Sequence, residues 1–235
     1  MSLRDAWETN ADAWVRWARA PDHDVYSKWH AGRFVDLLPP PGRLTVDLGA
    51  GEGRLGRDLA DLGHRVVAVD SSPTLATACA THEHALPTII GDAAAIPLLT
   101  RCADLVVAFM SLQDVDDLTG AVAEAARLLE PDGYLCAAIV HPLNSAGAFD
   151  GQEGDAPFIV RGSYLEAFRY HDDIERDGLV MDFHSEHRPL ESYSRALEDA
   201  GLVIEAIREV TTSDGDGRWS RIPMFLHWRA RPSAR

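Results

Sequence analysis

The sequence lacks any long apolar run, and no stretch of its 235 residues approaches the roughly 20 apolar residues that a membrane helix needs. It also lacks a cysteine framework, because the three cysteines, Cys79, Cys102 and Cys136, are far apart and odd in number. We therefore expect buried structural thiols rather than disulfides or a catalytic nucleophile. The first residues are charged and have no apolar core, which predicts no secretory signal and a cytoplasmic location.

Positive charge is also scarce. The chain has 22 Lys and Arg against 37 Asp and Glu, a formal net charge of −15. Such a field repels phosphate backbones, so nucleic acid is excluded as a partner and a neutral or cationic small molecule is favoured. Internal repeats and low-complexity segments are absent as well. The length and the 46% hydrophobic content fit one α/β domain with a small insertion, present as a monomer or homodimer.

Strand-like and helix-like patterns alternate through the middle of the chain. Helices are expected at 3–19 and 24–38, the second ending at the proline run 39–42. Strands separated by helical patterns predict right-handed βαβ units and a parallel sheet. The expected strands cover 44–48, 65–70, 88–90, 105–109 and 134–140, and the helices between them cover 53–62, 73–82 and 117–129.

The alternation stops after residue 141. Residues 142–162 are rich in Gly, Asp, Pro and Asn and predict a loop. Residues 163–172 and 178–187 predict a hairpin. The chain then returns to a helix and a final strand pair that must be antiparallel, with expected bounds of 189–200, 202–210 and 223–229 and a turn at 213–217.

The most informative motif is VDLGAGEGRLG, residues 46–56. Glycines at Gly49, Gly51 and Gly53 let the backbone approach a ligand closely, and the helix that follows aims free N–H groups at the same place. Asp70, at the end of the next strand, suits a ribose diol. The motif therefore predicts an adenosine-containing cofactor. Gly51, Gly53 and Gly56 also satisfy the dinucleotide pattern G-x-G-x-x-G, so NAD is the competing cofactor.

Four segments in this order and spacing resemble class I S-adenosylmethionine (SAM)-dependent methyltransferases: VDLGAGEGRLG, VVAVDSSPTL, GDAAAIP and LLEPDGYL. The resemblance is strong over about 44–141. The pattern near the C-terminus, HRPLESYSRALEDAGL, is similar to the small-molecule group related to ubiquinone and menaquinone methyltransferases (methyltransferase type 11). The methyltransferase resemblance as a whole implies an α/β fold: a Rossmann-like, seven-stranded, mostly parallel sheet with a C-terminal antiparallel strand pair.

The resemblance also implies an arrangement of units and a set of cofactor contacts. The units are a helical cap at 1–41, a SAM-binding core at 42–141, a hairpin lid at 142–188 and a C-terminal part at 189–235 that completes the core. The turn Gly49–Ala50–Gly51 would lie against the methionine moiety and Asp70 would bind the ribose. The remaining implied contacts are Ser71 beside the adenine, Asp92 at its amino group, and Phe109 and Met110 beside the cofactor.

Charge favours SAM over NAD. Asp47, just before the glycine turn, suits the ammonium group of SAM and would repel a pyrophosphate. Asp92 with the Ala93 N–H suits an adenine edge. Structural alternatives remain open for each acid: Asp47 as a strand-end residue, Asp70 as a helix N-cap and Asp92 as a turn residue.

Methyl transfer needs alignment and exclusion of water, and a general base if the nucleophile carries a proton. His141 and Asp114 follow predicted strands at the ligand-binding edge of the sheet and are the candidate catalytic residues. A loop hydrogen bond is the alternative for His141, and Asp114 can instead favour the N-terminus of the next helix. No metal site is predicted; His184 and His187, three apart on a strand, point to opposite faces.

Aromatic residues of the cap and of the 142–187 insertion are expected to form a lid, or alternatively to pack the cap onto the core. They include Trp7, Trp14, Trp17, Tyr26, Trp29, Phe158, Tyr164, Phe168, Tyr170 and Phe183. The sequence thus predicts transfer of a methyl group from SAM to O, N or C of a small molecule, with S-adenosylhomocysteine as product. The alternatives are a NAD-dependent oxidoreductase and a non-catalytic SAM-binding protein.

Overall fold

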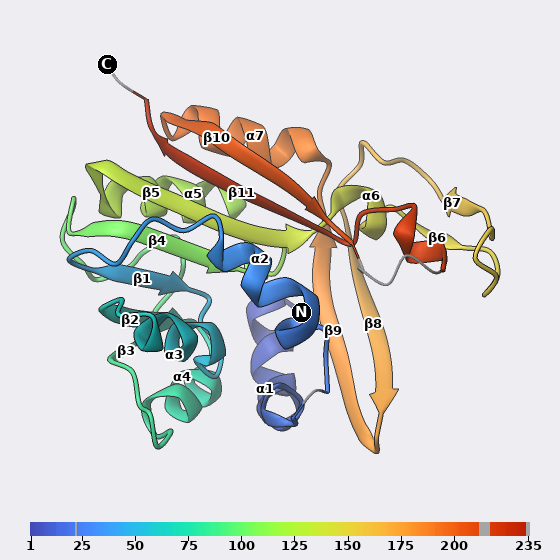
Figure 1. Ribbon diagram of the computed structural model, residues 1–235, viewed down its shortest axis with the longest axis horizontal. Coiled ribbons are helices and arrows are strands. Elements are labelled where there is room, and N and C mark those ends of the chain that lie inside the picture. The colour runs from blue at the N-terminus through green and yellow to red at the C-terminus, as the bar shows by residue number, and fades with distance from the viewer. Residues whose placement is uncertain (22, 212–216, 234–235) are drawn as a thin grey trace.

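Seven strands form one sheet in the order β10–β11–β5–β4–β1–β2–β3 (Figure 1). The computed structural model describes residues 1–21, 23–211 and 217–233, without the side chain of Trp29. The strands are β1 (Thr45–Leu48), β2 (Val66–Asp70), β3 (Thr88–Ile90), β4 (Ala103–Phe109), β5 (Leu129–Val140), β10 (Leu202–Val210) and β11 (Phe225–Pro232). Strands β1 to β5 pair in parallel and β11 is antiparallel to both neighbours, which confirms the predicted fold class.

Both faces of the central strands are buried. On β4 and β5, residues such as Val106 and Ile139 join a core with helices α5 (Leu118–Leu128) and α7 (Leu190–Asp199). Their neighbours Val107 and Ala138 join a second core with helix α3 (Arg54–Asp61). Because each strand is covered twice, it appears in the sequence as a continuous apolar run. Helix α4 (Pro73–Ala80) completes the βαβ pattern.

The N-terminal cap differs from its prediction after the first helix. Helix α1 (Leu3–Arg19) is as expected, but a π-helical turn, η1 (Tyr26–His30), and the short helix α2 (Ala31–Val35) replace the continuous helix predicted at 24–38. The Tyr26 hydroxyl donates to Asp58 Oδ2 at 2.7 Å, and the ring of His30 stacks on Phe225 at 4.0 Å. These tertiary contacts hold both ends of the wider turn and override local helix propensity.

The segment predicted as a loop at 142–162 contains regular elements. Helix α6 (Pro142–Ser145) is followed by strands β6 (Gly147–Phe149) and β7 (Phe158–Val160), which pair antiparallel. The predicted hairpin is present as β8 (Phe168–Arg176) and β9 (Leu179–His187). Its turn is Asp177–Gly178, with φ of 51° and 76°, the Asp-Gly turn that matches strand twist.

The β8–β9 hairpin extends away from the sheet and lies beside α1 (Figure 1). Cap and hairpin therefore meet over the same edge of the sheet. The turn predicted at 213–217 lies outside the described residues except for Gly217. Among the helices that the structure describes, none has the length and apolar character to cross a membrane.

Candidate functional site

A glycine-rich turn follows β1 and opens the site. Gly49, Gly51 and Gly53 have φ of 72°, 60° and 89°, in the left-handed region that glycine adopts without strain. A Cβ at Gly49 would lie 2.4 Å from Ser111 Cβ, so the backbones after β1 and β4 approach each other closely. The turn leaves its peptide groups exposed to a cavity, and α3 begins directly after Gly53.

Asp70 links this turn to the end of β2. Its Oδ2 accepts a hydrogen bond from Gly51 N at 2.7 Å, and its Oδ1 accepts one from Ser72 N at 2.9 Å. Burial raises the pKa of Asp70, and these backbone N–H groups oppose the shift. A carboxylate has about four lone-pair sites, so both oxygens keep the capacity to accept from a ligand in the cavity. The N-cap of α4 is Ser72 rather than Asp70.

Asp47 lies deeper, on β1. It is 1% exposed, and its Oδ2 has no hydrogen-bond partner among the described residues. Burial, together with the charge of Asp70, raises the pKa of Asp47 to about 7, although the nearby backbone N–H of Gly56 opposes the shift. An unpartnered buried acceptor of this kind costs about 1–3 kcal/mol unless something donates to it. Asp47 faces the cavity, so a cationic donor placed there would remove that cost.

The other predicted contacts line the same cavity. Asp92 lies in a turn after β3, where its Oδ1 accepts from Ala94 N at 2.9 Å, so it is both a turn residue and a wall residue. Met110, after β4, has φ of 56°, an uncommon conformation for a bulky residue and one that is found at functional sites. All of the cofactor contacts predicted from the sequence line this one cavity: Asp47, Gly49, Ala50, Gly51, Asp70, Ser71, Asp92, Ala93 and Met110.

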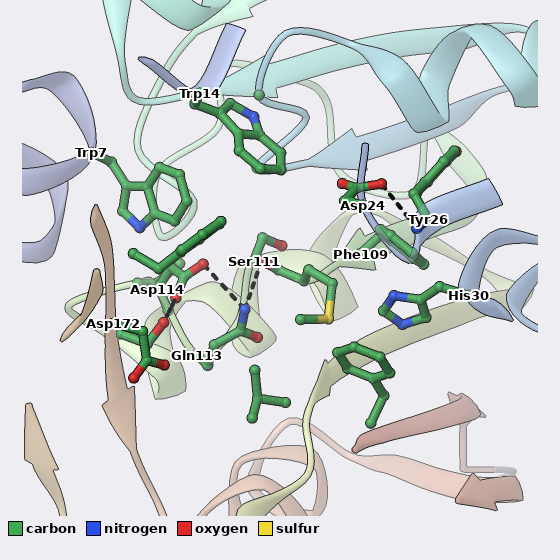
Figure 2. Close-up of a pocket in the computed structure, with 18 of the residues that line it drawn as sticks. Trp7, Trp14, Asp24, Tyr26, His30, Phe109, Ser111, Gln113, Asp114 and Asp172 are labelled. Carbon is green, nitrogen blue, oxygen red and sulfur yellow. Dashed lines mark hydrogen bonds between the residues drawn. The ribbon is translucent and has the colours of Figure 1, made fainter. Parts of the chain in front are cut away.

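The cavity has a volume of about 790 Å³ and lies at the carboxyl ends of the parallel strands, where open α/β sheets bind ligands. Trp7 and Trp14 of α1 lie on one side and His30 on another (Figure 2). The ring of Phe183 on β9 packs edge-on against three tryptophans, with centroid distances of 6.4, 6.0 and 5.7 Å to Trp7, Trp14 and Trp17. The aromatic residues of cap and hairpin thus join into one cover.

Two acids, half-buried Glu8 and buried Glu52, attach α1 to the ligand loops, and no sequence motif marked either of them. Glu8 accepts from the hydroxyls of Ser72 and Thr74, the latter at 2.7 Å. Glu52, within the glycine turn and 1% exposed, pairs with Arg19 at 2.7 Å. The cap is therefore held at both of the loops that line the cavity.

Comparisons with known proteins agree with this geometry. The methyltransferase domain family matches residues 46–137. A ubiquinone biosynthesis O-methyltransferase of Methylobacterium sp. is 30% identical over 211 residues, 84% of this chain and 74% of that protein. The chain belongs to the class I SAM-dependent methyltransferase family.

Other relatives are similar in sequence over a smaller share of their length, or are similar in fold alone. An uncharacterised methyltransferase of Mycobacterium tuberculosis is 36% identical over 99 residues, 42% of this chain and 40% of that protein. The chain thus matches about two fifths of the length of the first curated relatives. A SAM-dependent methyltransferase structure from Mesorhizobium loti has a TM-score of 0.66 at 23% identity, covering 85% of this chain and 96% of that one.

In this methyltransferase-family chain, the three acids after β4 have three different positions. Asp117 is the N-cap of α5 and accepts from Gly120 N at 2.8 Å. Asp116 accepts from Leu3 N at 3.0 Å at the start of α1. All three line the cavity, but Asp114 accepts from no helix N-terminus; its partners are the side chains of Ser185 and Gln113, so helix capping does not account for it.

Asp114 is held by neighbours from two elements. Its Oδ1 accepts from Ser185 Oγ of β9 at 2.6 Å, and its Oδ2 accepts from Gln113 Nε2 at 3.1 Å. Burial raises the pKa of Asp114 to about 8, although these bonds and the charge of Arg188 oppose the shift. The Oε1 of Gln113 has no partner in the described part of the chain (Figure 2). This end of the cavity therefore offers oxygen acceptors to a ligand that carries N–H or O–H groups.

His141 is not one of the described residues that line the cavity, although Asn144 and Ser145 just after it are. Its Nδ1 accepts from Leu143 N at 3.0 Å as the N-cap of α6, and its Nε2 lies 3.2 Å from Glu209 Oε1. Burial lowers the pKa of His141, opposed by Glu209. The loop hydrogen bond that was the structural alternative to a catalytic role for His141 is therefore present.

His30 lines the cavity, and sequence reasoning missed it. It is 3% exposed, and its Nε2 has no hydrogen-bond partner within 1–21, 23–211 and 217–233. Burial, with the nearby charges of His227 and Arg54, holds the pKa of His30 well below its usual range, so the ring is neutral. No motif marked this residue, because its position depends on the π-helical turn.

Proposed function

We propose that this chain transfers a methyl group from SAM to a small-molecule acceptor. The observation that carries the proposal is the buried, unpartnered Oδ2 of Asp47 at the base of a glycine-rich turn. An ammonium group satisfies that oxygen by a charge-assisted hydrogen bond. Family membership supports the same cofactor, as does the charge of the site.

The residues present fit SAM along the length of the cavity. Asp47 would hold its ammonium group, Asp70 its ribose hydroxyls, and Asp92 with the Ala93 N–H its adenine edge. NAD fits less well, because its pyrophosphate would lie at the start of α3 against the carboxylates of Asp47 and Asp70.

When bound, SAM supplies a methyl group already activated by its sulfonium. The protein then has to exclude water, orient the acceptor and receive a proton. Trp7, Trp14 and Phe183, which line the cavity and pack edge-on against one another, are the side chains that would shield the reacting atoms from water. We propose that Asp114 would receive the proton of the acceptor as the acceptor takes the methyl group and the bond from sulfur to methyl carbon breaks, with S-adenosylhomocysteine as the leaving group. Its pKa of about 8 makes it a stronger base than an ordinary carboxylate.

The same end of the cavity supports O or N rather than C as the attacking atom. Asp114 and the free Oε1 of Gln113 accept hydrogen bonds, which an amine or a hydroxyl donates and a carbon nucleophile does not. The name of the Methylobacterium relative, an O-methyltransferase of ubiquinone biosynthesis, agrees with oxygen as the attacking atom.

His141 remains a prediction as the base, but its contacts favour a structural role. Its ring nitrogens are engaged by Leu143 N and Glu209, outside the cavity lining. Two variants separate the candidates. Asp114→Asn should abolish turnover with binding of S-adenosylhomocysteine intact, whereas His141→Ala should keep turnover and lower stability by about 1 kcal/mol, the usual value of an N-cap. The reverse pattern would return the role to His141.

A non-catalytic SAM-binding protein is the remaining alternative. It predicts an occluded acceptor end, but the cavity continues past the cofactor contacts to Asp114, Tyr170 and Asn144. An acceptor without phosphate groups is supported by the net charge of −15. A cytoplasmic location and a monomeric or dimeric state stay predictions from the sequence.

Calorimetry and turnover test the proposal together. S-adenosylhomocysteine should bind with one site per chain, and NADH should not bind. A panel of phenols and amines with SAM should then release S-adenosylhomocysteine for at least one acceptor. If NADH binds and S-adenosylhomocysteine does not, SAM is not the cofactor. If S-adenosylhomocysteine binds but no acceptor of a broad panel is methylated, the non-catalytic alternative is favoured.

A further inference from the structure

Four metal-ligating side chains gather on the β8–β9 hairpin, on the face turned away from the cavity. In the hairpin register, His171 pairs with His184, and Asp173 pairs with Asp182. Successive side chains of a strand point to opposite faces, so these four share one face. The alternate residues of β8, among them Asp172, line the cavity instead.

The distances within this hairpin cluster suit a metal ion. His171 Nδ1 lies 3.2 Å from Asp182 Oδ1 and 3.8 Å from Asp173 Oδ2, and the three ligand atoms all lie within 4.8 Å of one another. Ligand atoms at about 2.0–2.1 Å from a tetrahedral Zn²⁺ are roughly 3.3 Å apart. Small side-chain movements therefore bring all three onto one ion.

His184 is not one of the three ligand residues but holds one of them, Asp182, in place. Its Nε2 lies 2.6 Å from Asp182 Oδ2, the oxygen that does not face His171, and its ring stacks on that of His171 at 5.6 Å. Metal-ligating carboxylates are oriented by such hydrogen bonds. With His184 holding one oxygen of Asp182, the other is directed at the cluster.

We propose that the hairpin binds one divalent transition-metal ion, of which Zn²⁺ is the best match, through His171, Asp173 and Asp182. A mixed nitrogen and oxygen set favours Zn²⁺ over Mg²⁺ or Ca²⁺, which prefer oxygen alone. Water completes the coordination on the exposed side. The ion joins β8 to β9 and so stiffens the hairpin that covers the cavity; it takes no part in methyl transfer.

The test is a metal titration of tag-free protein dialysed against a chelator. Calorimetry with Zn²⁺ should show one ion per chain, and Co²⁺ should give the visible absorption of a nitrogen- and oxygen-ligated site. His171→Ala and Asp182→Ala should each weaken binding by about 10- to 100-fold. Glu175→Gln removes a carboxylate from the same strand and face outside the hairpin cluster, and it should bind as the wild type does.

Thermal unfolding gives a second readout. Zn²⁺ should raise the Tm of the wild type and of Glu175→Gln but not of the hairpin-cluster variants, because only a native-state site stabilises the fold. The proposal is overturned if the wild type binds no ion. It is overturned equally if His171→Ala binds normally while His82→Asn, at the exposed His82–His84 pair, loses the ion.

Discussion

Two buried carboxylates at the carboxyl ends of adjacent strands, Asp47 and Asp70, give this cavity its chemical character. The two carboxylates differ in their hydrogen-bond partners within the protein. Asp70 is held by backbone N–H groups of Gly51 and Ser72, whereas the Oδ2 of Asp47 finds no partner among the described residues. The first is ready to accept from neutral hydroxyls, and the second needs a cation.

Asp70→Ala should weaken binding of S-adenosylhomocysteine by about 1–3 kcal/mol, the scale of lost charge-assisted hydrogen bonds. Part of this lost affinity comes from the protein itself, because Gly51 N loses its hydrogen-bond acceptor and the glycine turn is held less firmly. Calorimetry measures the affinity. Asp70→Asn keeps the shape and one oxygen acceptor and should lose less; an unchanged affinity in the alanine variant would remove the ribose assignment.

Binding should release protons from Asp47. Its pKa of about 7 in the free protein means that roughly half of the molecules carry a proton there at pH 7, and an ammonium partner lowers that pKa. SAM affinity should therefore rise as pH rises through 7. Calorimetry in buffers of different ionisation enthalpy should show a net release of protons at pH 7, and Asp47→Asn should release none from this site.

The elements of the site divide into those that were predictable and those that were not. The glycine turn, the end of β2 and the turn after β3 belong to consecutive βαβ units, so local sequence was sufficient to predict that their residues lie together at one cavity. Asp114 and His141 depend on contacts across the chain, with Ser185 and Glu209 respectively. A sequence shows that both follow strands, but not which one enters the cavity.

Contacts between residues far apart in the chain also explain why parts of the cap and the hairpin could not be predicted from local sequence. Residues 24–38 have helical periodicity, yet contacts of Tyr26 and His30 with distant elements convert part of it to a π-helical turn. His184 and His187, three residues apart on β9, have different partners: His184 Nε2 lies 2.6 Å from Asp182 Oδ2 and His187 Nδ1 lies 2.7 Å from Ser145 Oγ. His171 and Asp182 come together only through cross-strand register, which single-strand spacing does not reveal.

Gly51→Val should abolish cofactor binding. Its φ of 60° strains a β-branched residue by about 1–2 kcal/mol, and a Cβ would lie 3.2 Å from Trp14 Nε1 beside the cavity. Gly178→Val at the hairpin turn is the matched control, since its φ is 76° and nothing lies within 4 Å of the added Cβ. Both variants should lose stability, but only the first should lose binding in calorimetry.

The anchoring of α1 is testable in the same way. Glu8→Ala removes the acceptor of Ser72 and Thr74 and should weaken S-adenosylhomocysteine binding by about 5- to 30-fold, equivalent to about 1–2 kcal/mol, because the cap covers the cavity less firmly. Asp12→Ala, an exposed acid on the same helix, is the control and should bind normally. Equal affinities would show that α1 is packing alone.

At the scale of the whole molecule, the site lowers stability in exchange for function. Asp114 has a folded-state pKa of about 8 against the ordinary aspartate value of 3.8, so the folded state binds more protons than the unfolded state between these values. Its contribution is complete below the lower value and is lost as pH rises through about 8. Buried neutral histidines such as His30 oppose this at acidic pH.

The difference between wild type and Asp114→Asn isolates that contribution. Urea unfolding across this pH range should show the free energy of unfolding of the wild type falling with pH relative to that of the variant. Asparagine cannot ionise, so the variant lacks the decline. Parallel profiles would mean that Asp114 ionises normally and is not a tuned base.

Cofactor binding and methyl transfer both require a cavity lined by Asp47 and Asp114 that admits SAM. The most direct test is a crystal structure with S-adenosylhomocysteine. We predict its ammonium group on Asp47 Oδ2, its ribose hydroxyls on Asp70, and its sulfur facing the part of the cavity that holds Asp114. A cavity that stays empty at saturating ligand, or one that binds a dinucleotide with its pyrophosphate at the glycine turn, would contradict the account.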